Sequence, residues 1–104
     1  MKLRAYETDA QRCPFDEWFQ GLDGKLRRAV QRRLRAIQES DHFGDRKSLH
    51  GDLHELKFRQ AIRIYFTEFD GLIVLILGGS GKGNQPREIA KVRARLKDYK
   101  QRIR

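Results

Sequence analysis

Two neighbouring segments in the second half of the chain alternate apolar and polar side chains, and they constrain the fold more than any other feature. The segments are residues 53–58 and 61–66, separated by Arg59 and Gln60. Successive side chains of a β-strand point to opposite faces, so a period of two is typical of strands that bury one face. The pattern predicts an antiparallel hairpin whose apolar face carries Leu56, Phe58, Ile62, Ile64 and Phe66.

The opposite face of this hairpin carries polar side chains from both strands. A register that pairs Lys57 with Arg63 also pairs Glu55 with Tyr65, and it keeps the apolar side chains together. We expect this face to be exposed to solvent, where the four side chains suit binding a phosphate and moving a proton. The simpler alternative is an ordinary half-exposed strand in which Glu55 forms a surface ion pair with Arg63 or Lys57.

The first half of the chain predicts a strand and two helices. Residues 2–8 alternate weakly and suit an edge strand. Pro14 suits the first turn of a helix whose apolar stripe is Phe15, Trp18, Phe19 and Leu22. A second helix is expected over residues 25–39, and its inward positions are Leu26, Val30, Leu34 and Ile37. The short link between them predicts an antiparallel pair of helices.

The second half predicts a meander of three antiparallel strands and a last helix. Residues 40–52 contain glycines and mixed charges, so we expect a loop. After the hairpin, the Asp70-Gly71 turn leads into the apolar residues 72–77, which suit a central strand covered on both faces. The glycines of residues 78–83 predict a flexible segment. A helix from Pro86 onward has an apolar stripe at Ile89, Val92, Leu96, Tyr99 and Ile103.

These elements predict one α+β domain over residues 1–104, with helices packed on the sheet. The single cysteine suits a reducing compartment, and no apolar run is long enough to cross a bilayer. The first residues lack the apolar core of a signal peptide. We therefore expect a cytoplasmic protein without a membrane partner. Its formal charge of +9 favours a polyanion, and above all nucleic acid, as partner.

The positive charge is concentrated on two of the predicted helices. Every charged residue from 25 to 35 is basic, and the last helix carries far more basic than acidic side chains. Lysine and arginine neutralise backbone phosphates. The candidate nucleic-acid contacts are Arg28, Arg32, Arg35, Lys47, Arg59, Arg87 and Lys91. The alternative is that these residues form solvated faces without a partner.

Common metal, nucleotide and thiol motifs are absent from the sequence. One cysteine and three scattered histidines do not form a zinc signature. Residues 78–83 lack the spacing of a phosphate-binding P-loop, although they can present Lys82 to a bound phosphate. Cys13 has no evident histidine partner, and His54 has the parity of the apolar face. We expect neither a metal nor another cofactor.

Several segments occur in an order and spacing that resemble a known family. They are Phe15-Asp16-Glu17-Trp18-Phe19, Phe43-Gly44-Asp45-Arg46-Lys47, Leu53-His54-Glu55-Leu56-Lys57, Ile62-Arg63-Ile64-Tyr65-Phe66, Gly78-Gly79, Lys82 and Ile89-Ala90. Over nearly the whole chain they resemble the RelE/ParE toxin superfamily of bacterial toxin–antitoxin modules. The likeness is greatest to its phage-related, HigB-like branch, the addiction-module killer proteins.

The resemblance implies a RelE-like fold and a toxin neutralised by a helix-turn-helix antitoxin that an adjacent gene encodes. Many members cut mRNA on the ribosome without a metal, by attack of the ribose 2′-OH on the adjacent phosphorus. By the same resemblance, Arg63 stabilises transition-state charge, and Lys57 contacts the phosphate or acts as base. Glu55 is an alternative base, and Lys82 neutralises the leaving oxygen. Tyr65 stacks on a nucleobase or donates a proton.

The chain also departs from the family's pattern. RelE-type toxins carry a tyrosine at the start of the last helix and an arginine after the central strand, where this chain has Ile89 and Gly83. YoeB-like members use a late histidine, and no histidine follows His54. The ParE branch poisons DNA gyrase, so the fold alone does not decide the function. Three functions stay open: an mRNA endoribonuclease, a gyrase poison and a non-catalytic RNA-binding module.

Overall fold

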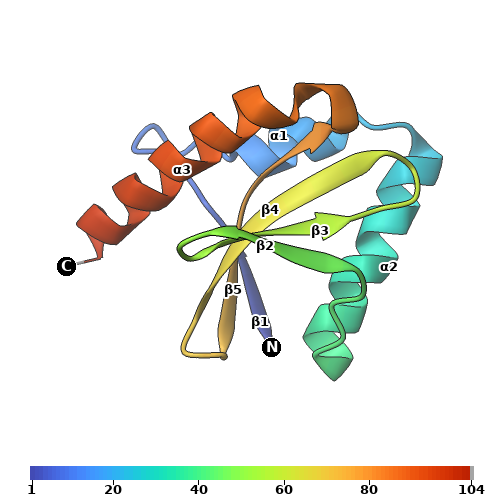
Figure 1. Ribbon diagram of the computed structural model, residues 1–104, viewed down its shortest axis with the longest axis horizontal. Helices are drawn as coiled ribbons and strands as arrows, with labels where there is room; N and C mark the ends of the chain where they lie inside the picture. The colour runs from blue at the N-terminus through green and yellow to red at the C-terminus, as the bar shows by residue number, and fades with distance from the viewer. Residues whose placement is uncertain (104) are drawn as a thin grey trace.

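A five-stranded mixed sheet with helices on both faces makes up the protein (Figure 1). The structure is a computed structural model that describes residues 1–103, and the side chains of Ile73 and Lys82 lie outside the described part. Its elements are β1 (Lys2–Ala5), α1 (Pro14–Gln20), α2 (Gly24–Ser40), β2 (Arg46–His50), β3 (Leu53–Lys57), β4 (Ile62–Phe69), β5 (Ile73–Gly81), the short helix η1 (Lys82–Asn84) and α3 (Gln85–Arg102).

The strands lie in the order β1-β5-β4-β3-β2. β1 is an edge strand parallel to β5, and the other neighbours are antiparallel. The predicted α+β class is therefore confirmed, with its N-terminal strand, helical pair, antiparallel strands and C-terminal helix. In the described residues, no helix is long and apolar enough to cross a membrane.

The predicted hairpin and its register are confirmed in β3 and β4. Lys57 pairs with Arg63, and Glu55 pairs with Tyr65. The chain turns where Ala61 adopts a positive φ of 60° and its N–H donates to the carbonyl of residue 58 at 3.3 Å. This turn sets the two alternating runs opposite each other, so their apolar side chains share one face of the sheet.

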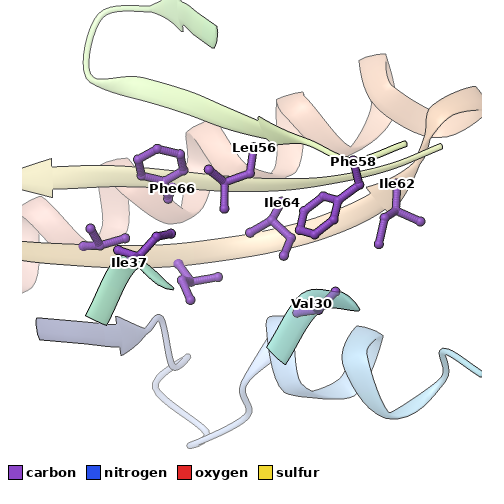
Figure 2. Packing of buried hydrophobic residues seen from close by; sticks show 9 residues of the cluster. Val30, Ile37, Leu56, Phe58, Ile62, Ile64 and Phe66 are labelled. Atoms are coloured by element: carbon purple, nitrogen blue, oxygen red, sulfur yellow. The ribbon is translucent and has the colours of Figure 1, made fainter. Parts of the chain in front are cut away.

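Helices α1 and α2 cover that apolar face. Val30 and Ile37 of α2 are 0% exposed and pack with Leu56, Ile64 and Phe66 of the hairpin (Figure 2). The predicted stripe of α1 packs against the same cluster. Helix α1 begins at proline and has acidic residues in its first turn, where the helix dipole favours them.

Helix α3 covers the opposite face, which carries the polar side chains of the hairpin. Val92 and Leu96 pack there with Leu77 and Tyr65. Strand β5 is thus buried on both faces, as its apolar run predicts. The predicted inward position of Ile103 is wrong, because α3 ends one residue earlier and this side chain is 57% exposed.

The glycines after the apolar run lie in a strand, so the predicted flexible segment is wrong for residues 78–81. Strand β5 continues to Gly81, and a β-bulge shifts its register against β4 near Tyr65. A Cβ at Gly78 would lie 2.5 Å from Arg95 Nη1, and one at Gly79 would lie 2.5 Å from the Trp18 ring. These glycines let α3 and α1 approach opposite faces of the strand.

The loop predicted over residues 40–52 contains a strand, so that prediction is also wrong in part. Arg46–His50 forms β2 and pairs with β3 at the edge of the sheet. The guanidinium of Arg46, in this strand, lies 4.4 Å from the centroid of the Phe43 ring and forms an ion pair with Glu68 of β4 at 2.9 Å. An edge strand with so few apolar residues shows little alternation of apolar and polar side chains, so the sequence pattern does not indicate it.

The contact between Trp18 and Gly79 predicts a matched pair of stability effects. Gly79→Ala should destabilise the protein by roughly 1–3 kcal/mol, because the new methyl group overpacks the Trp18 contact. Gly81→Ala lies two residues further along β5, where no described atom beyond the chain neighbours is within 4 Å of a Cβ, and should leave stability nearly unchanged. Urea unfolding of both variants measures the difference. Equal losses in the two variants would contradict the packing argument.

Candidate functional site

Three strands bring Lys57, Arg63 and Ser80 into one row across the α3-facing side of the sheet. Lys57 of β3 and Ser80 of β5 are the partners of Arg63 on either side. Because paired residues point to the same face, their side chains are neighbours on that face. The sequence predicted the first two as neighbours. It did not identify Ser80, because β5 was expected to end before this residue.

Arg63 is a buried guanidinium that has no acidic partner among the described residues. The side chain is 8% exposed, and Nη1 donates to the carbonyls of Ile62 at 2.9 Å and Phe58 at 3.4 Å. Nε is buried without a hydrogen-bond partner. Among the described residues, no ion pair includes Arg63, Lys57 or Glu55. The alternative that Glu55 neutralises one of these cations in a direct ion pair therefore has no counterpart in the structure.

The next row of this face contains Glu55 and Tyr65. Glu55 is 3% exposed, and one of its oxygens accepts a hydrogen bond from Nε2 of Gln85 at 3.2 Å. The Tyr65 hydroxyl lies 2.9 Å from the Ser80 hydroxyl. Burial raises the pKa of Tyr65 and the nearby Glu55 carboxylate raises it further, whereas the hydrogen bond with Ser80 lowers it. The phenol therefore stays protonated at neutral pH.

The expectation that this face is exposed is wrong for Glu55, Arg63 and Tyr65. Tyr65 is 0% exposed and packs with the apolar residues under α3. It is therefore not available to stack on a nucleobase. Lys57 is half-buried and remains the most accessible of the four side chains. The alternation of the hairpin places the four side chains on one face, but α3 decides how much of that face is covered.

Arg33 of α2 anchors the segment that leads to Lys57, a role the sequence did not indicate. Its guanidinium donates to the carbonyls of Phe43 at 2.7 Å, Asp45 at 2.6 Å and Lys57 at 2.9 Å. It also lies 4.6 Å from the centroid of the Phe58 ring. Burial lowers the pKa of Arg33, and Asp45 opposes that shift. The basic run of α2 gave no signal that one of its members points inward.

All seven residues predicted to contact nucleic acid are exposed, and they lie in separate regions of the surface. They are Arg28, Arg32 and Arg35 of α2, Lys47 of β2, Arg59 of the hairpin turn, and Arg87 and Lys91 of α3. One hollow beside α2 is lined by Arg32, Lys57 and Arg59, among other residues. A second hollow, beside the start of α3, brings Arg87 and Lys91 together with Ser80. The side chain of Lys82 lies outside the described part.

His54 lies away from this polar face, as its parity predicts. Its ring stacks on Phe66 at a centroid distance of 5.4 Å. Burial lowers the pKa of His54, Arg46 adds to the shift, and Glu68 and Asp52 oppose it. In the described part of the chain, no group of three or more His, Cys, Asp or Glu residues is arranged to hold a metal.

Comparison with known proteins finds one distant relative of note. No known family model matches the chain. An uncharacterised protein of Haemophilus influenzae is 29% identical over 82 residues, which cover 76% of this chain and 82% of the relative. This likeness carries no activity, so the function is argued from the site.

Removal of the Arg33 side chain should destabilise the protein more than removal of a surface arginine side chain. Arg33→Met leaves three carbonyl acceptors without their charged donor, and we expect a loss of about 2 kcal/mol or more. Arg32→Met, at the exposed neighbouring position, should change stability little. Urea unfolding of the two variants measures the contrast. A similar small effect in both would show that Arg33 is not an anchor.

The burial of His54 predicts a loss of stability in mild acid. The pKa of His54 is lowered in the folded protein, so the unfolded chain binds the proton more readily. Its contribution is present above the ordinary histidine pKa of about 6.5 and is lost as the pH falls through the lowered folded value. Urea unfolding at pH 7 and pH 5 should show this loss, and His54→Phe should lose less. An equal loss in His54→Phe would assign the effect to other groups.

Proposed function

We propose that the protein is the toxin of a type II toxin–antitoxin module and cleaves mRNA on the ribosome without a metal. The observation that carries this proposal is Arg63, a buried guanidinium beside Lys57 on the same face, for which the described part of the chain offers no acidic partner. A buried cation is costly unless an anion compensates it. A substrate phosphate would supply that anion, and the family resemblance supplies the class of substrate.

The proposed reaction is an attack of the ribose 2′-oxygen on the adjacent phosphorus. The new bond joins the 2′-oxygen to phosphorus, and the bond from phosphorus to the 5′-oxygen breaks. The products are a 2′,3′-cyclic phosphate and a 5′-hydroxyl. Negative charge grows on the phosphate oxygens, and preorganised cations in a poorly hydrated site stabilise such charge strongly. Arg63 takes this role, and Lys57 contacts the same phosphate from the neighbouring strand.

Two proton transfers complete the reaction. Glu55 takes the proton of the 2′-hydroxyl as the base, because a carboxylate oxygen accepts protons and this carboxyl group lies on the same face as Lys57 and Arg63. The hydrogen bond from Gln85 orients that carboxylate. The leaving 5′-oxygen receives its proton from the Tyr65–Ser80 hydroxyl pair. Ser80 lines the hollow beside the start of α3 and Tyr65 does not, so Ser80 is the member of the pair that donates to the leaving oxygen.

The basic surfaces account for the partners in this proposal. The exposed arginines of α2 and the exposed cations of α3 bind ribosomal RNA or mRNA through phosphates, in an interaction that weakens steeply with salt. The neutralising partner is a helix-turn-helix antitoxin from an adjacent gene, and the site of action is the cytoplasm. A helix-turn-helix reading frame beside this gene would support the toxin role without identifying its target.

The proposal is tested by expression from a tightly repressed promoter and primer extension of cellular transcripts. Wild type should arrest growth and produce codon-phased cuts. Arg63→Ala should lower cleavage roughly 100-fold or more, because it removes the main stabiliser of transition-state charge. Arg4→Ala changes an exposed arginine on the edge strand β1, which β5 and β4 separate from β3. This variant should cleave transcripts like wild type.

The other outcomes separate the remaining functions. Growth arrest with intact transcripts and trapped gyrase–DNA complexes would replace this proposal with a gyrase poison. RNA binding without growth arrest would indicate a basic module without catalysis. Soluble yield and the urea midpoint of each variant show whether a loss of activity is a loss of folding.

A further inference from the structure

The hollow beside the start of α3 is not accounted for by the reaction above. It is lined by residues of α1, of the end of β5 and of the first turns of α3; Figure 1 shows where these elements lie in the fold. We call it the α3 hollow. It is lined by Trp18, by residues 79–81, by the polar residues Asn84 and Glu88, and by the cations Arg87 and Lys91.

Two features of the sheet open this hollow. Strand β1 pairs with β5 only from residue 73 to 76, so in the described residues the last part of β5 has β4 on one side and no strand on the other. Gly81 leaves further space, since no described atom outside its two chain neighbours lies within 4 Å of a Cβ built there. Trp18 is held beside this space by its contact with Gly79.

The side chains of the α3 hollow combine three chemical functions. The half-buried Trp18 indole offers an aromatic surface. Asn84 makes no side-chain capping hydrogen bond to α3, and Glu88 bonds Arg95 through Oε1, which leaves Oε2 for another donor. Arg87 and Lys91 are exposed at the rim. An aromatic wall, amide and carboxylate groups, and rim cations match the base and phosphate of one nucleotide.

We propose that the α3 hollow binds one nucleobase of single-stranded RNA against Trp18, while Arg87 and Lys91 hold its phosphate. Ser80 lines the hollow and is also the strand partner of Arg63. The bound nucleotide is therefore a near neighbour of the proposed scissile phosphate. The identification of that RNA as substrate rests on the proposed function, but the binding of a base does not. Charge favours RNA over an extended peptide at the open edge of β5, because the rim is cationic and the protein carries +9.

Trp18 is the only tryptophan of the chain, so its fluorescence reports directly on the hollow. The probe is a 2′-O-methyl pentaribonucleotide, which lacks the attacking 2′-hydroxyl, and the comparison is the same backbone with abasic positions. We expect the base-containing probe to quench Trp18 and to bind about tenfold or more tightly than the abasic one. Raising the salt concentration should weaken the binding of both probes, because both carry the same phosphates.

Two glycine variants provide a matched test of where the base binds. Gly81→Leu fills the hollow without meeting any neighbour within 4 Å at Cβ, in an extended conformation that leucine adopts freely. This variant should bind the base-containing probe about tenfold more weakly and bind the abasic probe as wild type does. Gly83→Leu adds the same side chain in open space two residues away, outside the hollow, and should bind like wild type. Thermal unfolding confirms that both variants fold.

The possible results separate this inference from the proposed function. Equal binding of the two probes, or unchanged binding by Gly81→Leu, would overturn the base site even if the protein cuts mRNA. Base-dependent quenching by a protein that leaves transcripts intact would keep the base site and overturn the nuclease. Arg63→Ala should fail to cut and still quench, since Arg63 lies outside the hollow's lining.

Discussion

The paired strands β4 and β5 are buried on both faces, and the arrangement of every helix follows from that constraint. Even-numbered side chains of β4 meet α2 on one face, and Tyr65 meets α3 on the other. Helices α1 and α3 must both approach the end of β5 closely, and the absence of side chains at Gly78 and Gly79 provides the space. At Gly79 the Trp18 ring takes the place of a side chain, and at Gly78 the Arg95–Glu88 pair does so. Close packing of this kind tolerates little added volume.

The same constraint explains why the polar face of the hairpin is unusual. A polar group under a helix is costly unless it is hydrogen-bonded, and a charge costs more. Tyr65 and Ser80 satisfy each other, and Gln85 reaches back from the start of α3 to Glu55. Arg63 is compensated only in part, by backbone carbonyls, and its Nε has no hydrogen-bond partner among the residues that the structure describes. The fold therefore maintains a cation whose best remaining partner is an anion from outside the protein.

Much of this site was predictable from the sequence because strand alternation is a local property. The spacing of Lys57 and Arg63 around a short turn sufficed to predict their pairing, and the structure confirms it. The roles of Arg33 and Ser80 were not predictable in that way. Arg33 sits in a basic run whose other members are mostly exposed, and only the loop that folds back against α2 sets it apart. Ser80 joins the site because β5 continues through glycines, which sequence patterns associate with loops.

By itself, the sequence determined the strands of the hairpin, their register, three amphipathic helices and a strongly basic surface. These follow from side-chain period and charge, which neighbouring residues carry together. Only the tertiary structure decided that the polar face is covered, that Arg63 is buried, and that a hollow opens beside Trp18. Alternation states which side chains share a face of a strand. It does not state what packs on that face, because the covering helix α3 comes from a distant part of the chain.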